Sequence, residues 1–320
     1  MAAGWLAELD GSRVSVEVPA SSANLGAGYD CLGLALAMTN RIEVEVRAWS
    51  RGLIELTVEG EGRDELTDDR DNRFVRGLEA TLRTARGELS EGVGWRITMH
   101  NQIPLARGLG SSAAATVGGI LAGNALAGEA LSMPEMLRIA TEIEGHPDNA
   151  AAALLGGFVV SAAYDGAVEA IRFDAPRDLR AVLFIPDLRL PTDQMRAALP
   201  VTVPRKDAVA NLGAVAVGVA GLATGRYDLL ARLTTDRLHE PYRATVYPQL
   251  PRLVSAARGA GALGACLSGA GSTILAFADS MAGMTRIEAA FLAAAADTDL
   301  PGRVLVVEPR NAGGRVIDRA

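Results

Sequence analysis

A short strand, a glycine-rich loop and a long helix of small residues follow one another between residues 95 and 126, and this order constrains the fold most. Residues 95–100 alternate between apolar and polar side chains, which predicts a strand. Residues 111–126, rich in alanine and glycine, predict a helix with a serine cap. The loop between them reads Pro104-Leu-Ala-Arg-Gly108-Leu-Gly110-Ser-Ser112. The chain must therefore place a flexible, polar loop at the start of this helix.

The rest of the chain mixes strands and helices without a regular alternation. Strands are predicted at 13–19, 41–49 and 53–58, as an antiparallel meander, and helices at 72–86, 132–144 and 149–155. A hairpin at Asp165-Gly166 precedes strands at 180–185, 265–267, 273–277 and 303–308, and helices at 207–224, 248–258 and 280–296. This mixture favours an α+β fold, and 320 residues predict about two domains, which we place at 1–164 and 165–320.

The chain has a single lysine, Lys206, and this excludes several mechanisms. Lys206 lies in a turn-like Val-Pro-Arg-Lys-Asp segment, not in a glycine-rich loop or an apolar strand. A Walker A loop, a protein kinase and a Schiff-base enzyme each need a lysine in such a setting. A net charge of -7 gives no broad basic surface for nucleic acid, so we expect no nucleic-acid partner.

Cysteine content and apolar runs indicate the compartment. Cys31 and Cys266 cannot form a disulfide framework, and three histidines make a zinc cluster improbable, so we expect a reducing cytoplasm. The first thirteen residues do not have the pattern of an export signal. Apolar runs at 112–126, 150–164 and 212–224 are short for membrane spans, and we expect buried helices or strands there and no membrane.

The loop around Gly108 is suited to binding phosphate without a lysine. Its glycines allow backbone N–H groups to approach an anion, and the following helix start adds partial positive charge. The run from Gly108 to Ala113 also matches a dinucleotide fingerprint, but Pro104 and Arg107 separate it from the strand. Spacing alone does not separate a phosphate cradle from an ordinary helix start with a flexible loop.

Five other segments carry polar side chains or clustered glycines that could form a binding site. Residues 19–33 contain Asn24 and Asp30, which suit either a capped turn or a small polar ligand. Residues 142–149 contain Glu142, Glu144, His146, Asp148 and Asn149, which suit a capped helix or an oxygen-rich magnesium site. Arg196 and Arg243 could hold a carboxylate together, although a lone arginine is usually solvated; Gly269 lies in a glycine-rich turn.

Taken together, these segments resemble the GHMP small-molecule kinases, and most closely the homoserine kinase family. The resemblance rests on Ser22-Ala-Asn24-Leu-Gly-x-Gly-x-Asp30, the Gly108 loop, Glu144-Gly-His-Pro-Asp-Asn149, Thr192-x-x-x-Arg196, His239-Glu-Pro-Tyr-Arg243 and the Gly269 turn. It implies a domain like ribosomal protein S5 domain 2, which binds ATP, followed by a ferredoxin-like domain. It further implies a cytoplasmic enzyme of threonine biosynthesis that phosphorylates the side-chain hydroxyl of L-homoserine with ATP and Mg²⁺. A homodimer is common in the family.

The resemblance also implies roles for individual residues. Ser112 and Glu144 would bind magnesium, with Glu142 as an alternative, and Asn72 would lie near the adenine, although Arg73 replaces the usual leucine. The acceptor would be surrounded by Asn24, Asp30, His146, Thr192, Arg196, Arg243 and Gly269. The ATP phosphates would be wrapped by Pro104, Leu105, Ala106, Arg107, Gly108, Leu109, Gly110, Ser111, Ser112, Ala113 and Ala114.

Charge and proton chemistry are consistent with this resemblance. Homoserine is a zwitterion, so Asp30 can pair with its ammonium while Arg196 and Arg243 pair with its carboxylate. Asn149 stands where many relatives have an aspartate base, and an amide cannot take the proton. We expect Asn149 to orient the hydroxyl while the proton goes to the phosphate. A different alcohol substrate, or a nucleotide- or RNA-binding relative without catalysis, remains an alternative.

Overall fold

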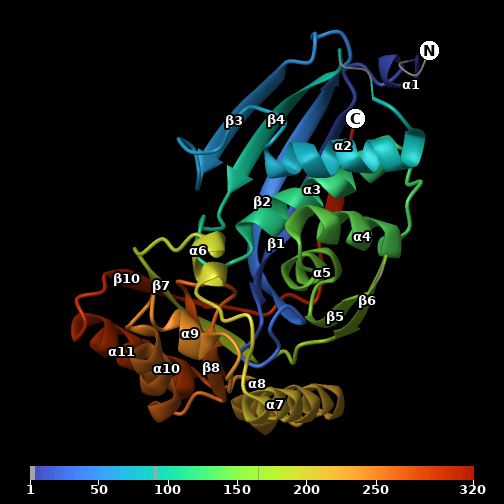
Figure 1. Ribbon diagram of the computed structural model, residues 1–320. Coiled ribbons are helices and arrows are strands. Elements are labelled where there is room, and N and C mark those ends of the chain that lie inside the picture. Colours follow the sequence, from blue (N-terminus) through green and yellow to red (C-terminus); the bar gives the residue numbers. More distant parts are fainter. Residues whose placement is uncertain (1–3, 90–91, 165) are drawn as a thin grey trace.

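The computed structural model describes residues 4–89, 92–164 and 166–320, which form two β-sheets with their helices (Figure 1). After a short helix α1 (Gly4–Ala7), the first sheet has the strand order β11-β1-β2-β4-β3, with the hairpin β5-β6 attached through β2. Its strands are β1 (Arg13–Ala23), β2 (Leu32–Arg47), β3 (Ile54–Gly60), β4 (Gly94–Asn101), β5 (Phe158–Tyr164), β6 (Ala167–Phe173) and β11 (Arg315–Arg319). Both sheets belong to an α+β architecture, as the sequence predicts.

The predicted antiparallel meander is wrong at its third strand. β1 and β2 pair antiparallel, as do β2 and β4, but β3 pairs with β4 in parallel at the edge of the sheet. The helix α2 (Arg73–Arg86) lies between β3 and β4 in the sequence, and it provides the crossover that a parallel pair requires. The sequence pattern predicted where these strands lie but not which strands pair with one another.

Four helices lie on one face of the first sheet (Figure 1). They are α2, α3 (Ser111–Leu126), α4 (Met133–Glu144) and α5 (Asp148–Leu155). The backbones of α2 and α3 touch, because a Cβ atom on Gly119 would lie 2.0 Å from the carbonyl oxygen of Phe74. The small residues of α3 thus allow close helix packing, which fixes the start of α3 beneath the glycine-rich loop.

The second sheet has the order β10-β7-β9-β8, with antiparallel pairs throughout. Its strands are β7 (Arg180–Pro186), β8 (Gly264–Leu267), β9 (Ile274–Ala278) and β10 (Gly302–Val307). Helices α10 (Leu250–Gly259) and α11 (Met281–Ala296) precede β8 and β10 in the chain and pack against this sheet. Helical residues between β7 and β8 and a helix between β9 and β10 give the β-α-β-β-α-β order of a ferredoxin-like domain, as expected.

The first sheet takes strands from both sides of the expected domain boundary. β6 and the C-terminal strand β11 both belong to the first sheet, although they lie beyond residue 164. The predicted β5-β6 hairpin is present, but its turn residue Asp165 lies outside the described residues. The division at 164/165 stays a prediction.

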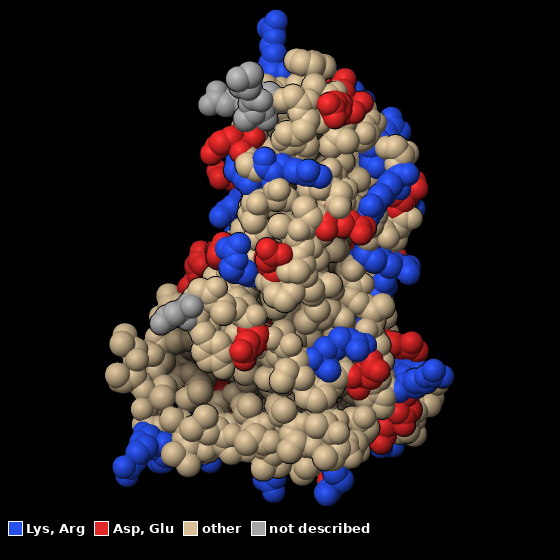
Figure 2. Space-filling view, turned by 90° about the vertical axis from the view of Figure 1, so that its right-hand side faces the viewer, with Lys and Arg blue, Asp and Glu red and all other residues tan. Residues whose placement is uncertain are grey.

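Between β7 and β8 lie α6 (Thr192–Ala197), α7 (Arg205–Thr224), η1 (Tyr227–Leu229), α8 (Leu230–Leu233) and α9 (Glu240–Arg243). The expectation of a buried helix is wrong for α7, where only Asn211, Gly218, Gly221 and Leu222 are buried. By length and composition alone α7 could cross a membrane, a test that helices of soluble proteins also pass. On the face shown in Figure 2, basic and acidic side chains are interspersed, without a broad basic area among the residues described there.

Candidate active site

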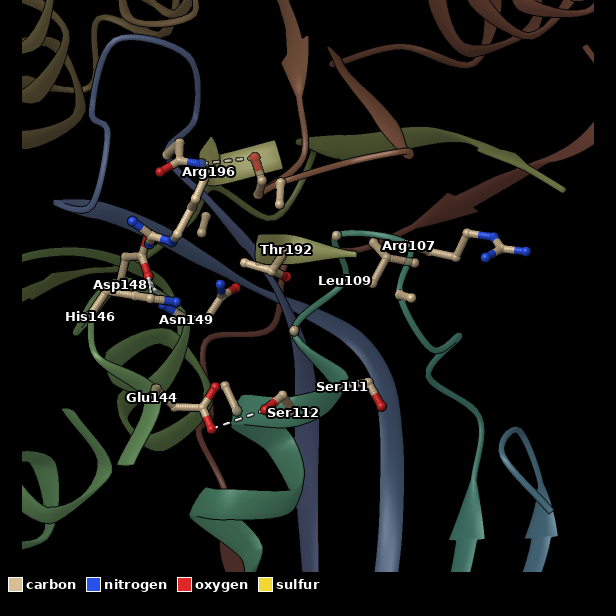
Figure 3. A pocket seen from close by; sticks show the side chains of 18 of the residues that line it. Arg107, Leu109, Ser111, Ser112, Glu144, His146, Asp148, Asn149, Thr192 and Arg196 are labelled. Carbon is tan, nitrogen blue, oxygen red and sulfur yellow. Dashed lines mark hydrogen bonds and ion pairs between the residues drawn. The ribbon is translucent and has the colours of Figure 1, made fainter. Parts of the chain in front are cut away.

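Segments far apart in the sequence line one cavity of about 410 Å³ (Figure 3). Most of the residues that the sequence singles out are in this lining. They are Asn24, Asp30, Pro104, Ala106, Arg107, Gly108, Leu109, Gly110, Ser111, Ser112, Ala113, Glu144, His146, Asn149, Thr192, Arg196, Arg243 and Gly269. Asn72 and Leu105 instead line a neighbouring cavity of about 280 Å³, and Ala114 is buried and lines neither.

The glycine-rich loop enters α3 in a way that leaves backbone donors for a ligand. The predicted serine cap is wrong: Gly110, with φ +70°, is the N-cap, and no side chain caps the helix. The first N–H groups of α3 therefore have no capping side chain, and an anion can accept hydrogen bonds from them. Gly110 is required because a Cβ atom there would lie 2.0 Å from Ser21 Oγ.

The turn after β8 holds the loop from the other side. Ser268 Oγ donates to the carbonyl oxygen of Gly108 at 2.7 Å and lies 2.8 Å from Ser22 Oγ. The backbone N–H of Gly269 donates to the carbonyl oxygen of Ala23 at 3.1 Å. Three glycine-rich segments thus meet at one place, which fixes the loop before any ligand binds.

A cluster of oxygen atoms lies at the start of α3. Ser112 Oγ and Thr116 Oγ1 donate to Glu144 Oε1 at 3.0 and 2.6 Å, and the Glu144 side chain is 6% exposed. Glu142 instead pairs with Arg138 at the surface, and its side chain is 60% exposed. The geometry therefore favours Glu144 over Glu142 as a metal ligand. Sequence reasoning missed Thr116, although it lies one helical turn after Ser112.

Asn149 is oriented by a residue that the sequence analysis did not select. Ser21 Oγ donates to Asn149 Oδ1 at 2.8 Å, across 128 positions of sequence. With its oxygen engaged, the amide retains its Nδ2 hydrogens for a ligand in the cavity that it lines. Ser21 belongs to the Ser-Ser-Ala-Asn24 motif, but that motif does not reveal which serine contacts Asn149.

Asp30 and Arg196, two residues of opposite charge predicted to bind the acceptor, pair with one another. Arg196 donates to both carboxylate oxygens of Asp30, at 2.7 and 3.0 Å, and to the hydroxyl of Tyr29 at 2.7 Å. The two charged side chains are each one-third exposed. A zwitterionic ligand would exchange this internal pair for one pair at each of its own charges.

Arg243 lies deeper and is 1% exposed. Its guanidinium donates to the carbonyl oxygen of Gly269 at 2.9 Å and to His239 Nδ1 at 3.0 Å. His239 Nε2 donates to the carbonyl oxygen of Gly26, so this imidazole is neutral with its proton on Nε2. Burial accordingly lowers the pKa of His239 to about 4.

Asn24 holds two other residues of the cavity wall in place through its side-chain amide. Its Nδ2 donates to the carbonyl oxygen of Gly269 at 2.8 Å, and its Oδ1 accepts from the backbone N–H of Asp30 at 3.0 Å. Both ends of this buried amide are therefore used to hold predicted ligand-binding residues. The geometry gives Asn24 a positioning role beside any contact with a ligand.

His146 is held by its neighbour Asp148, which the sequence analysis had placed in the segment suited to a helix cap or a magnesium site. His146 Nδ1 lies 2.7 Å from Asp148 Oδ1. Burial opposes protonation, but the hydrogen bond and charge of the buried Asp148 carboxylate prevail and raise the pKa of His146. The imidazole, exposed Thr192 at the start of α6 and Arg196 lie around the same end of the cavity (Figure 3).

The second cavity adjoins the first, and the start of α2 forms part of its wall. Arg73, Ala106, Ser111 and Ser112 line both cavities. Asn72 Oδ1 caps α2 by accepting from the N–H of Phe74 at 3.0 Å, while its Nδ2 donates to Thr67 at 2.9 Å. Asn72 thus shapes this cavity through the helix start.

Comparison with known proteins identifies the family. A family model described as GHMP kinases N terminal domain matches residues 72–157, and one described as GHMP kinases C terminal matches residues 211–295. Homoserine kinase of Caldicellulosiruptor bescii is 43% identical over 271 residues, which are 83% of this chain and 84% of that protein. Homoserine kinase of Moorella thermoacetica is 40% identical over 302 residues, 94% and 99% of the two chains.

Solved structures of related proteins support the same family assignment. A crystal structure of homoserine kinase from Cytophaga hutchinsonii superposes with a TM-score of 0.84 at 30% identity, covering 95% of this chain and 97% of that chain. Mevalonate kinase of L. major has a TM-score of 0.66 at 17% identity, covering 92% and 95% of the two chains, and it shares the fold. With both domain models and 40–43% identity to such relatives, the chain belongs to the homoserine kinase family of the GHMP kinases.

Proposed function

We propose that this protein transfers the γ-phosphoryl group of ATP to the side-chain hydroxyl of L-homoserine, as a step of threonine biosynthesis. The observation that carries the proposal is one cavity lined by both a lysine-free phosphate loop and the Asp30–Arg196 pair. The names of the most similar relatives support the same reaction. A cavity with an anion cradle at one end and paired charges at the other suits a triphosphate beside a small zwitterion.

The nucleotide would occupy both cavities. The second cavity, walled by Leu66, Met99, Leu105 and Ala115, suits a flat, largely apolar base. The phosphates would then lie along residues 104–113, where the N–H groups at the start of α3 donate to their oxygens. These backbone donors substitute for the lysine of other phosphate-binding loops.

Magnesium fits the oxygen cluster at the start of α3. Ser112 and Glu144 would hold the ion, because a hydroxyl and a carboxylate are the hard oxygen donors that Mg²⁺ prefers. Thr116 keeps Glu144 Oε1 in place through its hydrogen bond of 2.6 Å. When bound, Mg²⁺ neutralises charge on the phosphate oxygens.

The acceptor would lie at the charged end of the cavity. Its ammonium would replace Arg196 as the partner of Asp30, and its carboxylate would face Arg196 and Arg243. An alcohol without both charges would leave the Asp30–Arg196 pair closed and would gain none of the charge-assisted contacts that a zwitterion gains there. This is the physical basis for an amino-acid acceptor.

Asn149 would position the acceptor hydroxyl. Because Ser21 occupies its oxygen, the Asn149 amide donates from Nδ2 and cannot accept the proton. In a loose phosphoryl-transfer transition state the bond to the attacking hydroxyl is barely formed, so little positive charge develops on its oxygen; positioning is then sufficient, and the proton passes to the transferred phosphate.

An acceptor panel tests this proposal. The protein with MgATP is supplied with L-homoserine, D-homoserine, L-serine, mevalonate or no acceptor, and ADP release and the phosphorus spectrum of the product are recorded. We expect an O-phosphomonoester from L-homoserine at the highest kcat/KM. Preference for mevalonate would replace the proposed substrate, and a lack of ATP turnover with every acceptor would contradict kinase activity.

A further inference from the structure

Arg73, the first residue of α2, lies at the junction of the two cavities. It is one of four residues that line both, and it is the only charged one among them. Its side chain is 41% exposed. A cation at this junction faces the path along which a nucleotide spanning both cavities would run.

The guanidinium of Arg73 is only partly engaged. Its Nη1 donates to the carbonyl oxygen of Ile143 at 2.8 Å, and the same nitrogen lies 3.8 Å from Glu144 Oε1. That second distance is an ion pair without a hydrogen bond, because Ser112 and Thr116 already donate to this oxygen. Among the described residues no partner is found for the Nε or Nη2 groups, which leaves one edge of the planar group for a ligand.

The other arginines that line the first cavity are already bound to protein groups. Arg107 donates through Nε to the carbonyl oxygen of Pro186, and its side chain points away from the cavity (Figure 3). Arg196 is paired with Asp30, and Arg243 is buried against Gly269 and His239. Of the arginines in this lining, Arg73 alone combines partial exposure with a weakly held charge beside Glu144.

We propose that Arg73 is a further nucleotide-binding residue, which binds the phosphate oxygens of ATP and supplies the positive charge that Arg107 of the loop directs away from the cavity. The inference rests on the proposed ATP-dependent function. Glu144 would hold Mg²⁺ when the ion is bound, and Arg73 would then exchange its loose pair with Glu144 for the phosphate oxygens. A guanidinium is suited to this exchange, because its planar donors bind phosphate oxygens in pairs while it keeps its full charge.

Equilibrium binding separates this role from a purely structural one. ATP, AMP and adenosine are titrated calorimetrically, with Mg²⁺ and without acceptor, into the wild type, Arg73→Leu, Arg73→Lys and the matched control Arg76→Leu. Arg76 lies on the same helix, is exposed, and lines neither cavity. We expect Arg73→Leu to weaken ATP about 10- to 100-fold and adenosine hardly at all. Arg73→Lys should restore part of the loss, and Arg76→Leu should behave as the wild type.

Each contrary outcome has a definite meaning. Equal loss of ATP and adenosine in Arg73→Leu would show that Arg73 shapes the base cavity, and unchanged ATP binding would show that it only joins α2 to α4; either overturns the inference while the proposed function stands. If the wild type binds ATP but phosphorylates another alcohol, the proposed substrate is overturned and the inference about Arg73 still stands. A wild type that binds no adenine nucleotide overturns both.

Discussion

The two ends of the active-site cavity are built in opposite ways. The proposed phosphate end, residues 104–113, offers backbone donors between mostly small side chains and is fixed by contacts with Ser21 and Ser268. The acceptor end consists of the charged side chains of Asp30, Arg196 and Arg243, each bound to another protein group. The first end is complete before a ligand binds, whereas the second must exchange internal partners for those of the ligand.

This difference also appears in how much charge each end buries. Behind the acceptor end, Arg243 and His239 are at most 1% exposed, and burial raises the pKa of nearby Glu240 to about 8. Burying charged groups lowers stability unless each is paired and hydrogen-bonded. We therefore expect changes at the phosphate end to act through geometry, and changes at the acceptor end to act through charge.

The largest effect is expected at Gly110. In Gly110→Ala, the new Cβ would lie 2.0 Å from Ser21 Oγ and 3.1 Å from Asn149 Oδ1, in a backbone conformation that alanine disfavours. Displacing both side chains should lower kcat/KM about 1,000-fold and the free energy of unfolding by about 2–4 kcal/mol. Steady-state kinetics and urea unfolding measure the two quantities.

Gly225→Ala is the matched control for this variant. Gly225 has almost the same φ, +72°, but a Cβ atom there would have no neighbour within 4 Å, and the residue caps α7 far along the chain. This variant should lose about 1 kcal/mol of stability and keep its kcat. If both variants lost activity equally, backbone strain rather than the contact with Ser21 would explain the result.

The next largest effect concerns the Ser21–Asn149 pair. Asn149→Ala should lower kcat about 100- to 1,000-fold with little change in KM, because it removes a donor that acts at the reacting atoms. Ser21→Ala should lower kcat about 10-fold by freeing the amide to rotate. Steady-state kinetics of the wild type, both single variants and the double variant form a double-mutant cycle that measures the coupling between Ser21 and Asn149.

We expect the double variant to be no slower than Asn149→Ala, because Ser21 acts only through Asn149. Effects that multiply would show that Ser21 contributes independently, and an unchanged rate in Asn149→Ala would remove the asparagine from the reaction.

The same contrast decides how much the sequence could predict. The loop of the proposed phosphate end could be located from glycine spacing and a helix start, because the local sequence determines backbone geometry, although spacing alone did not assign phosphate to it. The partner of Asn149 could not, since Ser21 is 128 positions away and only the folded sheet brings the two together. The parallel pairing of β3 and the exposure of α7 were also missed, because hydrophobic periodicity contains neither strand order nor the neighbours of a helix.

At the acceptor end, local sequence supplied the residue types without their mutual contacts. Asp30 and Arg196 were each assigned to a ligand charge, and the structure adds that they pair with one another over 166 positions. Asn24 was expected beside the ligand and is engaged at both ends by the protein. Long-range pairing of this kind depends on the whole fold, which is why motif spacing did not reveal it.

The Asp30–Arg196 exchange should produce a smaller effect, confined to the acceptor. Asp30→Asn and Arg196→Gln should each raise the KM for homoserine about 10- to 100-fold, because each removes one charge-assisted contact, and leave the KM for ATP unchanged. Initial-rate kinetics over both substrates give the two constants. A comparable rise in the KM for ATP would show that the ends of the cavity are not independent.

The smallest effect concerns the charge behind the acceptor end. Glu240 Oε1 accepts from the backbone N–H of Leu267 at 2.7 Å, and burial raises the pKa of this carboxyl to about 8. The unfolded chain loses this proton near pH 4.3 and the folded protein retains it, so the stability of the wild type should fall as the pH rises from about 4.5 to 8. Glu240→Gln keeps the shape and carries no proton to lose.

The variant and the wild type should therefore unfold alike at pH 4.5 and diverge at pH 8.5. Glu240 borders a solvent-open cavity, which limits the burial cost, so we expect the variant to be more stable by about 1–2 kcal/mol at the higher pH. Urea unfolding at both values measures this difference. A variant equally or less stable at pH 8.5 would mean that Arg258 and the Leu267 amide compensate the carboxylate, and the acceptor end would then carry less uncompensated charge than its burial indicates.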